Sequence, residues 1–315
     1  MEITQSYGFS KEYALPPLPL GEWKSTKSTL HLYAQIVGKI RLKLFPKKNH
    51  WWHVSLYVST RGITTGPIPY GFGSFEIELD LIDHAVLVRT NTGAHQTFPL
   101  YNGLSVAEFY TRLLHALEAL GVHVDIVATP YEIPDAGPFA DDREHRDYDR
   151  EYVSRYWRIL VAVDGIMEEF RGRFIGKSTP VHLFWHSFDL ALTRFSGRPV
   201  PVRAESNQVE REAYSHEVIS FGFWAGDDNV PEPAFYSYVY PEPQGLRDQQ
   251  LRPEHSFWGT VRGGAEALLM YEHVRASDDP RGMILDFFQS AYEAGARTAA
   301  WDQDAFALKT LEPAE

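Results

Sequence analysis

A ten-residue stretch of this chain occurs twice, and this repeat restricts the possible folds more than any other feature of the sequence. Residues 52–61 read WHVSLYVSTR and residues 185–194 read WHSFDLALTR, so Trp-His and Thr-Arg stand at identical spacing in both. A Pro-x-Pro sequence follows soon after each copy. Because copies of an internal repeat build the same structural unit, the sequence predicts a fold made of two similar halves.

Apolar periodicity predicts the same order of elements in both halves. In the first half we expect an amphipathic helix over 25–44, strands at 52–60, 63–68, 75–82, 84–90 and 96–100, and a helix opened by the capping box Ser105-Val106-Ala107-Glu108. In the second half we expect a helix over 149–174, strands at 181–195, 216–224, 234–240 and 266–273, and a helix with Pro280 in its first turn. A further strand is expected at 122–128. Lys39 to Leu44 also alternates with period two, so the sequence leaves open whether these residues end the first helix or begin a strand.

These elements predict an α+β fold of two tandem helix, antiparallel sheet, helix repeats, with the helices on one face of each sheet. The layout is similar to the TATA-binding-protein-like and helix-grip folds, a likeness that implies no function. A connector rich in Pro, Asp and Arg separates the repeats, so we place the first at residues 1–135 and the second at 136–315. If the two halves form one continuous saddle, a site is expected near their junction.

Composition excludes several classes of function. The formal charge is −12, from 42 acidic and 30 basic residues, and such a chain would repel the phosphate backbone of nucleic acids. The chain has no cysteine, which removes thiolate nucleophiles and thiolate metal ligands. Residues 1–6 lack the basic and apolar regions of a signal peptide, and no run approaches the roughly 18 apolar residues of a membrane span. We therefore predict a cytoplasmic monomer or homodimer without nucleic-acid or membrane partners.

Several segments of the chain resemble a known family. They are Gln35–Leu42, Asn49–Val54, Thr65–Gly71, Ser187–Arg198 and Tyr214–Val218. These segments are similar to a bacterial family described as domain of unknown function 5996, and the resemblance spans residues 18–301. What the resemblance implies is therefore membership of a family, with no catalytic residue to carry over.

The second copy of the repeat contains the first candidate site. If residues 181–195 form one strand, its alternation gives one face to His182, His186, Phe188, Leu190, Leu192 and Arg194. The corresponding face of the first copy is polar and consists of His53, Ser55, Tyr57, Ser59 and Arg61. An apolar patch rimmed by His and Arg is typical of a ligand surface, and equally of a face that packs against the other half.

Three further patterns have ordinary structural interpretations. Asp189 would point into the helix layer, where a bond to Thr193 or Trp185 is favoured over a catalytic role. The segment 172–179 ends in Gly-Lys-Ser-Thr, but its spacer is one residue too short for a phosphate loop and it follows a helix, so we interpret it as a helix-stop turn. The alternating acids Glu76, Glu78 and Asp80 are interpreted as a solvated strand face, with cation binding as the alternative.

A second candidate site would combine residues from neighbouring strands. His182 and His186 on one strand would lie about 13 Å apart, too far to bind the same metal ion. A divalent metal would instead recruit His182 or His186 together with His216 or Glu217 from a neighbouring strand. Because His216 and Glu217 are adjacent on a strand, they face opposite ways and only one can line a given pocket. Tyr238 would line the same surface as part of a ring-lined clamp or would belong to a cross-strand aromatic ladder.

Three functions from different classes follow from these patterns. The first is binding of a small, partly apolar and anionic ligand on the sheet face of the second half, with Arg194 and His182 as polar anchors. The second is a metal-assisted hydrolase or lyase that uses His182, His216 and Glu217. The third is a non-catalytic protein-interaction module in which the apolar face is an interface. No cofactor is evident from the sequence apart from the divalent metal of the second hypothesis.

Overall fold

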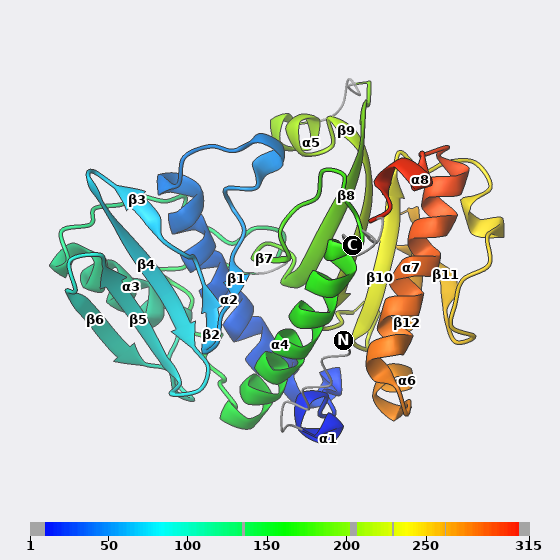
Figure 1. The fold of residues 1–315 in the computed structure, drawn as a ribbon. Coiled ribbons are helices and arrows are strands. Elements are labelled where there is room, and N and C mark those ends of the chain that lie inside the picture. The colour runs from blue at the N-terminus through cyan, green and yellow to red at the C-terminus, as the bar shows by residue number, and fades with distance from the viewer. Residues whose placement is uncertain (1–9, 134–135, 202–206, 229, 262, 309–315) are drawn as a thin grey trace, which may run out of the picture.

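The computed structural model describes residues 10–133, 136–201, 207–228, 230–261 and 263–308 (Figure 1). The elements of the first half are α1 (Lys11–Ala14), α2 (Leu20–Leu44), the 3-10 helix η1 (Asn49–Trp51), β1 (Tyr57–Val58), β2 (Gly62–Thr64), β3 (Ile68–Tyr70), β4 (Gly73–Asp80), β5 (Ala85–Thr90), β6 (His95–Pro99) and α3 (Val106–Ala119). Those of the second half are α4 (Arg150–Gly172), β7 (His182–Phe184), β8 (Asp189–Pro199), α5 (Gln208–Ala213), β9 (His216–Trp224), β10 (Ala234–Tyr240), η2 (Leu246–Asp248), β11 (Phe257–Val261), β12 (Gly264–Met270), α6 (Tyr271–Ala276), α7 (Pro280–Thr298) and α8 (Gln303–Phe306).

The strands form two antiparallel sheets, which confirms the predicted α+β class. Sheet 1 has the order β1-β2-β4-β5-β6, with β3 paired to β4, and sheet 2 has the order β11-β12-β10-β9-β8-β7. Helices α2 and α3 lie behind sheet 1 in Figure 1, whereas α4 and α7 lie in front of sheet 2. The repeat boundary predicted at residue 135 falls outside the described residues. The likeness to the TATA-binding-protein-like or helix-grip folds stays a prediction.

Helix starts follow the caps that the sequence predicts. The Ser105 hydroxyl accepts a hydrogen bond from the backbone N–H of Glu108 (3.2 Å) at the start of α3, and Asp279 caps α7 directly before Pro280. The ambiguous segment after Lys39 is the last part of α2. Ile40 is buried there and continues the apolar stripe of the helix, so the helical period outweighs the local alternation.

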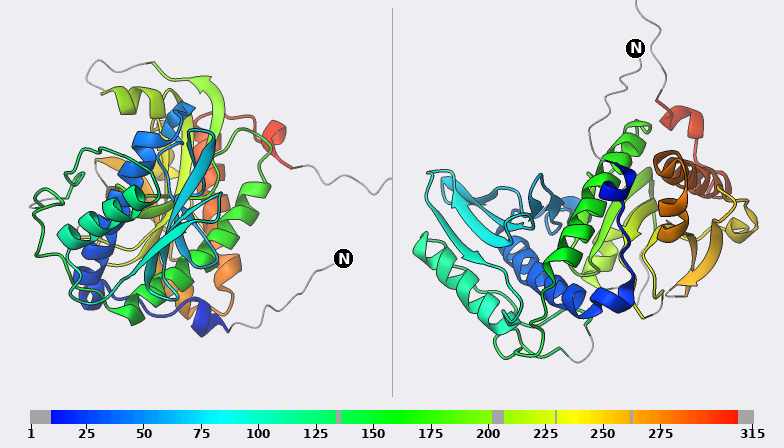
Figure 2. Two further views of the ribbon diagram at one scale, coloured as in Figure 1. Left: turned by 90° about the vertical axis from the view of Figure 1, so that its left-hand side faces the viewer. Right: turned by 90° about the horizontal axis from the view of Figure 1, so that it is seen from below.

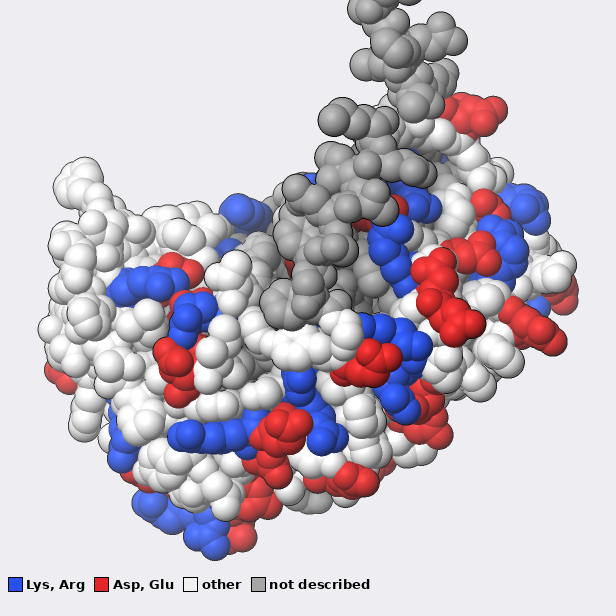
Figure 3. Space-filling view, turned by 60° about the horizontal axis from the view of Figure 1, so that its bottom comes forward, with Lys and Arg blue, Asp and Glu red and all other residues white. Residues whose placement is uncertain are grey.

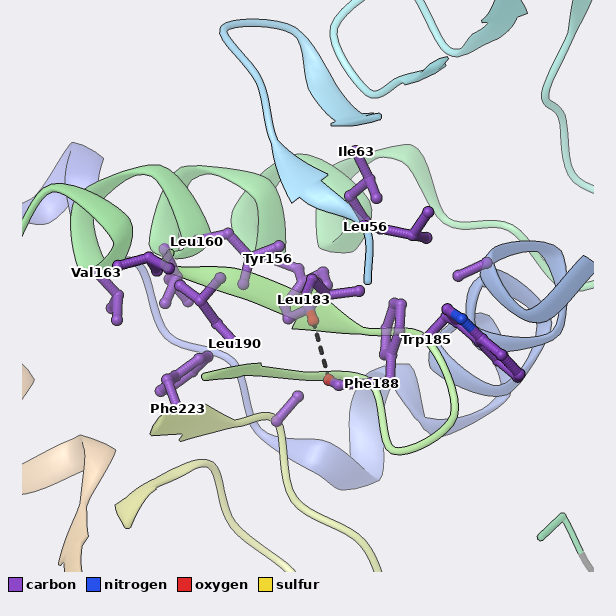
Figure 4. Close-up of a cluster of buried hydrophobic side chains, with 14 of the residues drawn as sticks. Leu56, Ile63, Tyr156, Leu160, Val163, Leu183, Trp185, Phe188, Leu190 and Phe223 are labelled. Atoms are coloured by element: carbon purple, nitrogen blue, oxygen red, sulfur yellow. Dashed lines mark hydrogen bonds between the residues drawn. The ribbon is translucent and has the colours of Figure 1, made fainter. Parts of the chain in front are cut away.

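The two halves meet at an isolated pair of backbone hydrogen bonds. The N–H groups of Leu56 and Leu183 each donate to the carbonyl of the other residue, at 2.9 and 2.8 Å, so β1 and β7 lie side by side. Both leucines are 0% exposed and pack with Tyr156 of α4 (Figure 4). Trp185 adds a further link because its indole Nε1 donates to the carbonyl of Val54 (2.9 Å). One apolar core therefore runs through both halves.

The two copies of the sequence repeat do not adopt the same local structure. Residues 52–54 form a turn after η1 and only residues 57–58 pair as β1, so the strand predicted over 52–60 is wrong. Trp52 instead packs against Phe195 of β8, with ring centroids 5.7 Å apart. The strand propensity of its aromatic and β-branched residues is thus overridden by packing onto sheet 2. In the second copy, residues 185–188 form a hairpin turn between β7 and β8.

Residues 122–128 are not a strand either, although their composition predicts one. Val122 and Ile126 are buried, which accounts for the apolar pattern of the segment. Neither sheet offers it a pairing partner among the described strands. The apolar alternation of this segment therefore indicates burial of its side chains and does not indicate pairing in a sheet.

Charges of both signs are interspersed on the face of the molecule shown in Figure 3. Along α4, Arg155 pairs with Glu151 and Arg173 pairs with Glu169, in each case four residues apart. Such pairs contribute only a few tenths of a kcal/mol each, so they are features of a solvated helix surface. No helix in the described residues combines the length and the apolar character needed to cross a membrane.

Candidate functional site

The hairpin between β7 and β8 decides which candidate side chains share a face. His182 pairs with Ala191, and directly paired residues point to the same face of a sheet. Ala191 and Arg194 are three residues apart on β8, so they face opposite ways. The expectation that His182 and Arg194 share a face is therefore wrong. That expectation assumed one strand over 181–195, whereas the turn at 185–188 resets the alternation.

The apolar patch predicted as a ligand surface belongs to the core. Phe188, Leu190 and Leu192 are all 0% exposed, and α4 packs against β8 on the face of the two leucines (Figure 4). The structure thus has the alternative interpretation of this pattern, in which these apolar side chains pack inside the protein. The interaction-module hypothesis thereby loses the exposed apolar face on which it rested.

Arg194 lies within this core and not beside His182. Its guanidinium is 1% exposed, donates to the carbonyl of Phe170 and lies 3.7 Å from the ring of Phe170 and 4.7 Å from the ring of Tyr292. Burial lowers the pKa of Arg194 to about 9. Stacking on aromatic faces offsets part of the cost of burying this cation, which is a structural role.

The other side of sheet 2 carries His182, and we call it the open face. Its residues are His182 and Phe184 on β7, Asp189, Ala191 and Thr193 on β8, Ser220 and Gly222 on β9, and Tyr236 and Tyr238 on β10. Seen from below, α4 and α7 lie on the opposite side of sheet 2, and α2 lies beside its β7 edge (Figure 2). Neither α4 nor α7 covers this side of sheet 2, but its side chains are mostly buried, with His182, Ala191 and Asp189 at 0%, 1% and 7% exposure.

His182 is fully buried at the junction end of the open face. Its imidazole is 0% exposed, and neither Nδ1 nor Nε2 has a hydrogen-bond partner in the described part of the chain. Burial, and secondarily the charges of His186 and Arg41, lower the pKa of His182 to about 3. The ring of Phe184 packs against the imidazole at 4.5 Å. His182 is therefore a neutral, unsatisfied polar group.

Arg41 of α2 is the neighbour of His182 that the sequence analysis missed. Its guanidinium is 3% exposed, donates from Nη1 to the carbonyl of Thr65 and lies 4.0 Å from the ring of Phe45 and 5.4 Å from that of Tyr57. Its Nε has no partner among the described residues, and burial lowers its pKa. Arg41 lies on the buried stripe of α2, so a charged residue at an apolar helix position was the signal available in the sequence.

His53 and His186 lie near this pair and have local partners. His53 is 4% exposed, its Nδ1 accepts a hydrogen bond from the backbone N–H of Lys48 (3.3 Å), and burial lowers its pKa. His186 is half-buried in the hairpin turn, edge-on to the ring of Tyr131 at 5.9 Å. Arg61, the remaining candidate of the first copy, directly precedes β2 and forms ion pairs with the carboxylates of Asp80 and Asp83.

Asp189 lies on the open face and not in the helix layer. Its carboxylate accepts hydrogen bonds from the hydroxyls of Ser187 and Tyr236. The predicted bonds to Thr193 or Trp185 are therefore wrong. A Cβ at Gly222 would lie 2.4 Å from Cζ of Tyr236, so the glycine leaves room for this ring to lie across the sheet toward Asp189.

Tyr238 continues the same hydroxyl network along the open face. Its ring stacks on that of Tyr236 at 6.3 Å and its hydroxyl meets that of Tyr214 at 3.1 Å. Thr193 and Ser220 share a hydrogen bond of 2.6 Å beside it. Tyr236 and Tyr238 pair across the sheet with Gly222 and Ser220, so the predicted cross-strand aromatic ladder is wrong for Tyr238, and the two rings instead stack along β10.

The residues of the metal hypothesis do not gather. Glu217 points to the helix side, where its carboxylate accepts from Ser196 (2.9 Å) and from the indole Nε1 of Trp301 (3.0 Å). His216 points the other way, toward His50, with ring centroids 5.4 Å apart. His182 lies at the junction, away from both. Within the described ranges no three His, Asp or Glu side chains are placed to hold a metal ion.

The alternating acids of β4 are engaged by cations and hydroxyls. Arg89 donates to Glu76 (3.1 Å) and to Glu78 (2.9 Å), and Ser59 donates to Glu78 (2.6 Å). Glu78 and Asp80 are 3% and 5% exposed, so the expected solvated face is more buried than predicted. Their charges are satisfied within the fold.

A protein-family model matches almost the whole chain. The family is described as a Family of unknown function (DUF5996), and the match covers residues 15–308. Comparison with curated proteins gave no match, and comparison with solved structures gave none either. The resemblance noted from the sequence is therefore confirmed, and the family description assigns no function.

Proposed function

We propose that this chain, which belongs to the Family of unknown function (DUF5996), binds a small, partly apolar anion beside Arg41 and His182. The site lies where the two halves meet, at the end of the open face next to β7. As in the site predicted from the sequence, His182 is a polar anchor. The cation is Arg41, whereas the sequence predicted Arg194. The proposal is for binding and assigns no chemical reaction.

One observation carries the proposal. Nε of Arg41 and both ring nitrogens of His182 are buried and have no hydrogen-bond partner among the described residues. An unsatisfied buried donor costs about 1–3 kcal/mol, and a buried guanidinium without a counter-charge costs more. A carboxylate that accepts from Arg41 and from one N–H of His182 would offset both costs. Because water is largely excluded from both groups, the attraction would be stronger than at the surface.

The rings around the pair define the apolar part of the ligand. Phe45 and Tyr57 flank the guanidinium and Phe184 flanks the imidazole. Tyr57 and Phe184 are half-buried, so they connect the buried pair to the surface. A carboxylate attached to a small aromatic or aliphatic group matches a cation that is surrounded by rings.

Benzoate is expected to bind the wild-type protein and to bind Arg41→Gln at least tenfold more weakly, a loss of about 1.4 kcal/mol or more. The reason is that the variant keeps the rings and removes the charge. Isothermal titration in a buffer without carboxylates measures both affinities. Arg194→Gln is the matched control, because it removes a buried arginine from the opposite face of sheet 2, and it should keep the affinity of the wild type.

A second readout separates binding at this pair from binding elsewhere. An anion next to His182 favours the imidazolium, so benzoate should raise the pKa of His182 from its value of about 3. The imidazole resonances followed by NMR against pH, with and without benzoate, would show this shift. Equal affinities for Arg41→Gln and Arg194→Gln, or a His182 titration that benzoate leaves in place, would contradict the proposal.

A further inference from the structure

A second cluster of polar side chains lies outside the proposed site, at the corner where η1, α5 and the segment before β7 meet the ends of β8 and β9. We call it the basic corner and define it by His50, Lys177, Ser215 and His216. Lys177 Nζ lies 2.7 Å from Nε2 of His50, and the rings of His50 and His216 are 5.4 Å apart. Ser215 Oγ lies 3.1 Å from Nδ1 of His216. Three segments that are distant in the sequence thus place their polar atoms together.

Hydrogen bonds fix the donors of the basic corner. Lys177 is a cation and can only donate, so Nε2 of His50 accepts and its Nδ1 carries the proton that is directed at the carbonyl of Ala213 (3.3 Å). The hydroxyl of Ser215 donates to the carbonyl of Glu212 (3.1 Å), which leaves its oxygen to accept from Nδ1 of His216. Both imidazoles are thereby held in place by the backbone, directly or through Ser215.

The nearby carboxylates are engaged elsewhere. Glu212 pairs with Lys47 (2.7 Å) and accepts from Gln208 (3.0 Å), and Glu217 points to the other face of sheet 2. In the described part of the chain no ion pair involves Lys177. Burial and the charge of Lys177 lower the pKa of His50. The corner therefore holds one cation and two imidazoles that would gain from a nearby anion.

Aromatic rings form the wall of the basic corner. Lys177 Nζ lies 5.4 Å from the ring centroid of Trp52 and 5.1 Å from that of Phe195. Trp52 is half-buried and Lys177 is exposed, so this wall is open to solvent on one side. A flat apolar group could stack on the indole while its charged end reaches Lys177.

We propose that the basic corner binds a phosphate monoester carried on a small planar group. A phosphate dianion supplies three strong acceptor oxygens and favours the imidazolium forms of His50 and His216, in which Nε2 of each ring becomes a donor beside the ammonium of Lys177. A monoanionic carboxylate has two oxygens and would leave one donor unused. This site is independent of the proposed function, since it shares no residue with Arg41 and His182. It also differs from a phosphate loop, because Lys177 acts from a segment that leads into a strand and not into a helix.

Phenyl phosphate is the probe that tests this site by isothermal titration. We expect saturable binding to the wild type, and about tenfold weaker binding to Lys177→Gln, because the variant loses the one permanent charge of the corner. Lys47→Gln is the matched control: it removes an exposed lysine nearby that is already paired with Glu212, and it should change the affinity less than about twofold. Trp52→Ala should bring the affinity for phenyl phosphate down to that for inorganic phosphate.

Two outcomes would overturn the inference. One is the absence of saturable phenyl phosphate binding to the wild type. The other is an equal loss in Lys177→Gln and Lys47→Gln, which would indicate general attraction of the anion to surface lysines. Arg41→Gln should leave phenyl phosphate binding at the wild-type level, so failure of this site and failure of the proposed function are distinguished by the same set of proteins.

Discussion

Between pH 7 and pH 5, two histidines that must stay neutral in the folded protein, the half-buried His31 and the buried His182, are together expected to lower the free energy of unfolding by about 4 kcal/mol. Burial is the main cause that lowers the pKa values of His31 and His182, each to about 3. In the unfolded chain both titrate near 6.5. Below pH 6.5 the unfolded state therefore binds protons that the folded state rejects. At pH 5 each histidine contributes a loss of about 2 kcal/mol.

The sign and window of this effect follow from the lowered pKa values. The contribution of His31 and His182 to the free energy of unfolding is fully present above pH 6.5 and is lost progressively as the pH falls toward about 3. Urea unfolding at pH 7 and pH 5, in buffers without carboxylates, measures the difference. His182→Leu should lose about 2 kcal/mol less stability than the wild type over this range, since the contribution of one histidine is gone. His95→Asn, at an exposed position of β6, is the control for replacing a histidine. The same pH dependence in His182→Leu and the wild type would contradict the assignment.

The sequence was sufficient for elements whose local signals agree with their packing. The strands predicted at 216–224 and 234–240 are β9 and β10 with the predicted ends, and the helix beginning at Pro280 is α7. In each of these, apolar spacing and turn or cap residues point to the same structure. The first copy of the repeat lacked this agreement. Its aromatic residues favour a strand, but Trp52 packs against the ring of Phe195. The chain therefore turns at this position instead of continuing as a strand.

The composition of the proposed site differs from the one that the sequence predicted. The sequence predicted a site near the junction only if the halves formed one continuous sheet; the structure has two sheets, and His182 lies fully buried where they meet. The sequence assigned Arg194 as the cation because a four-residue turn was read as part of a strand, and one missed turn reverses the face of every later residue. Arg41 stands out locally as a charged residue on the apolar stripe of α2, but its proximity to His182 depends on how α2 packs beside the β7–β8 hairpin, a tertiary contact that the local pattern does not give.

Gly38→Ala is expected to lower the free energy of unfolding by about 3 kcal/mol, although alanine is the better helix former. Gly38 lies where α2 meets the hairpin turn before β8. A Cβ at this position would lie 2.1 Å from the Cγ and Cδ1 atoms of Trp185. Those atoms are at the base of the indole, and the ring is held by its hydrogen bond to Val54 (2.9 Å). The ring cannot swing aside, so the helix has to move.

Gly165→Ala is the matched control, because Gly165 lies in the interior of α4 and its added Cβ would meet no atom within 4 Å. That variant should gain roughly 1 kcal/mol from helix propensity alone. Changes of opposite sign in the free energy of unfolding by urea would show that the cost of Gly38→Ala arises at the contact with Trp185. A gain in stability in both variants would show that the indole moves freely. Arg41 follows Gly38 by three residues on α2, so displacement of the helix should also weaken benzoate binding. The contact between Gly38 and Trp185 would then be what holds the cation of the proposed site against sheet 2.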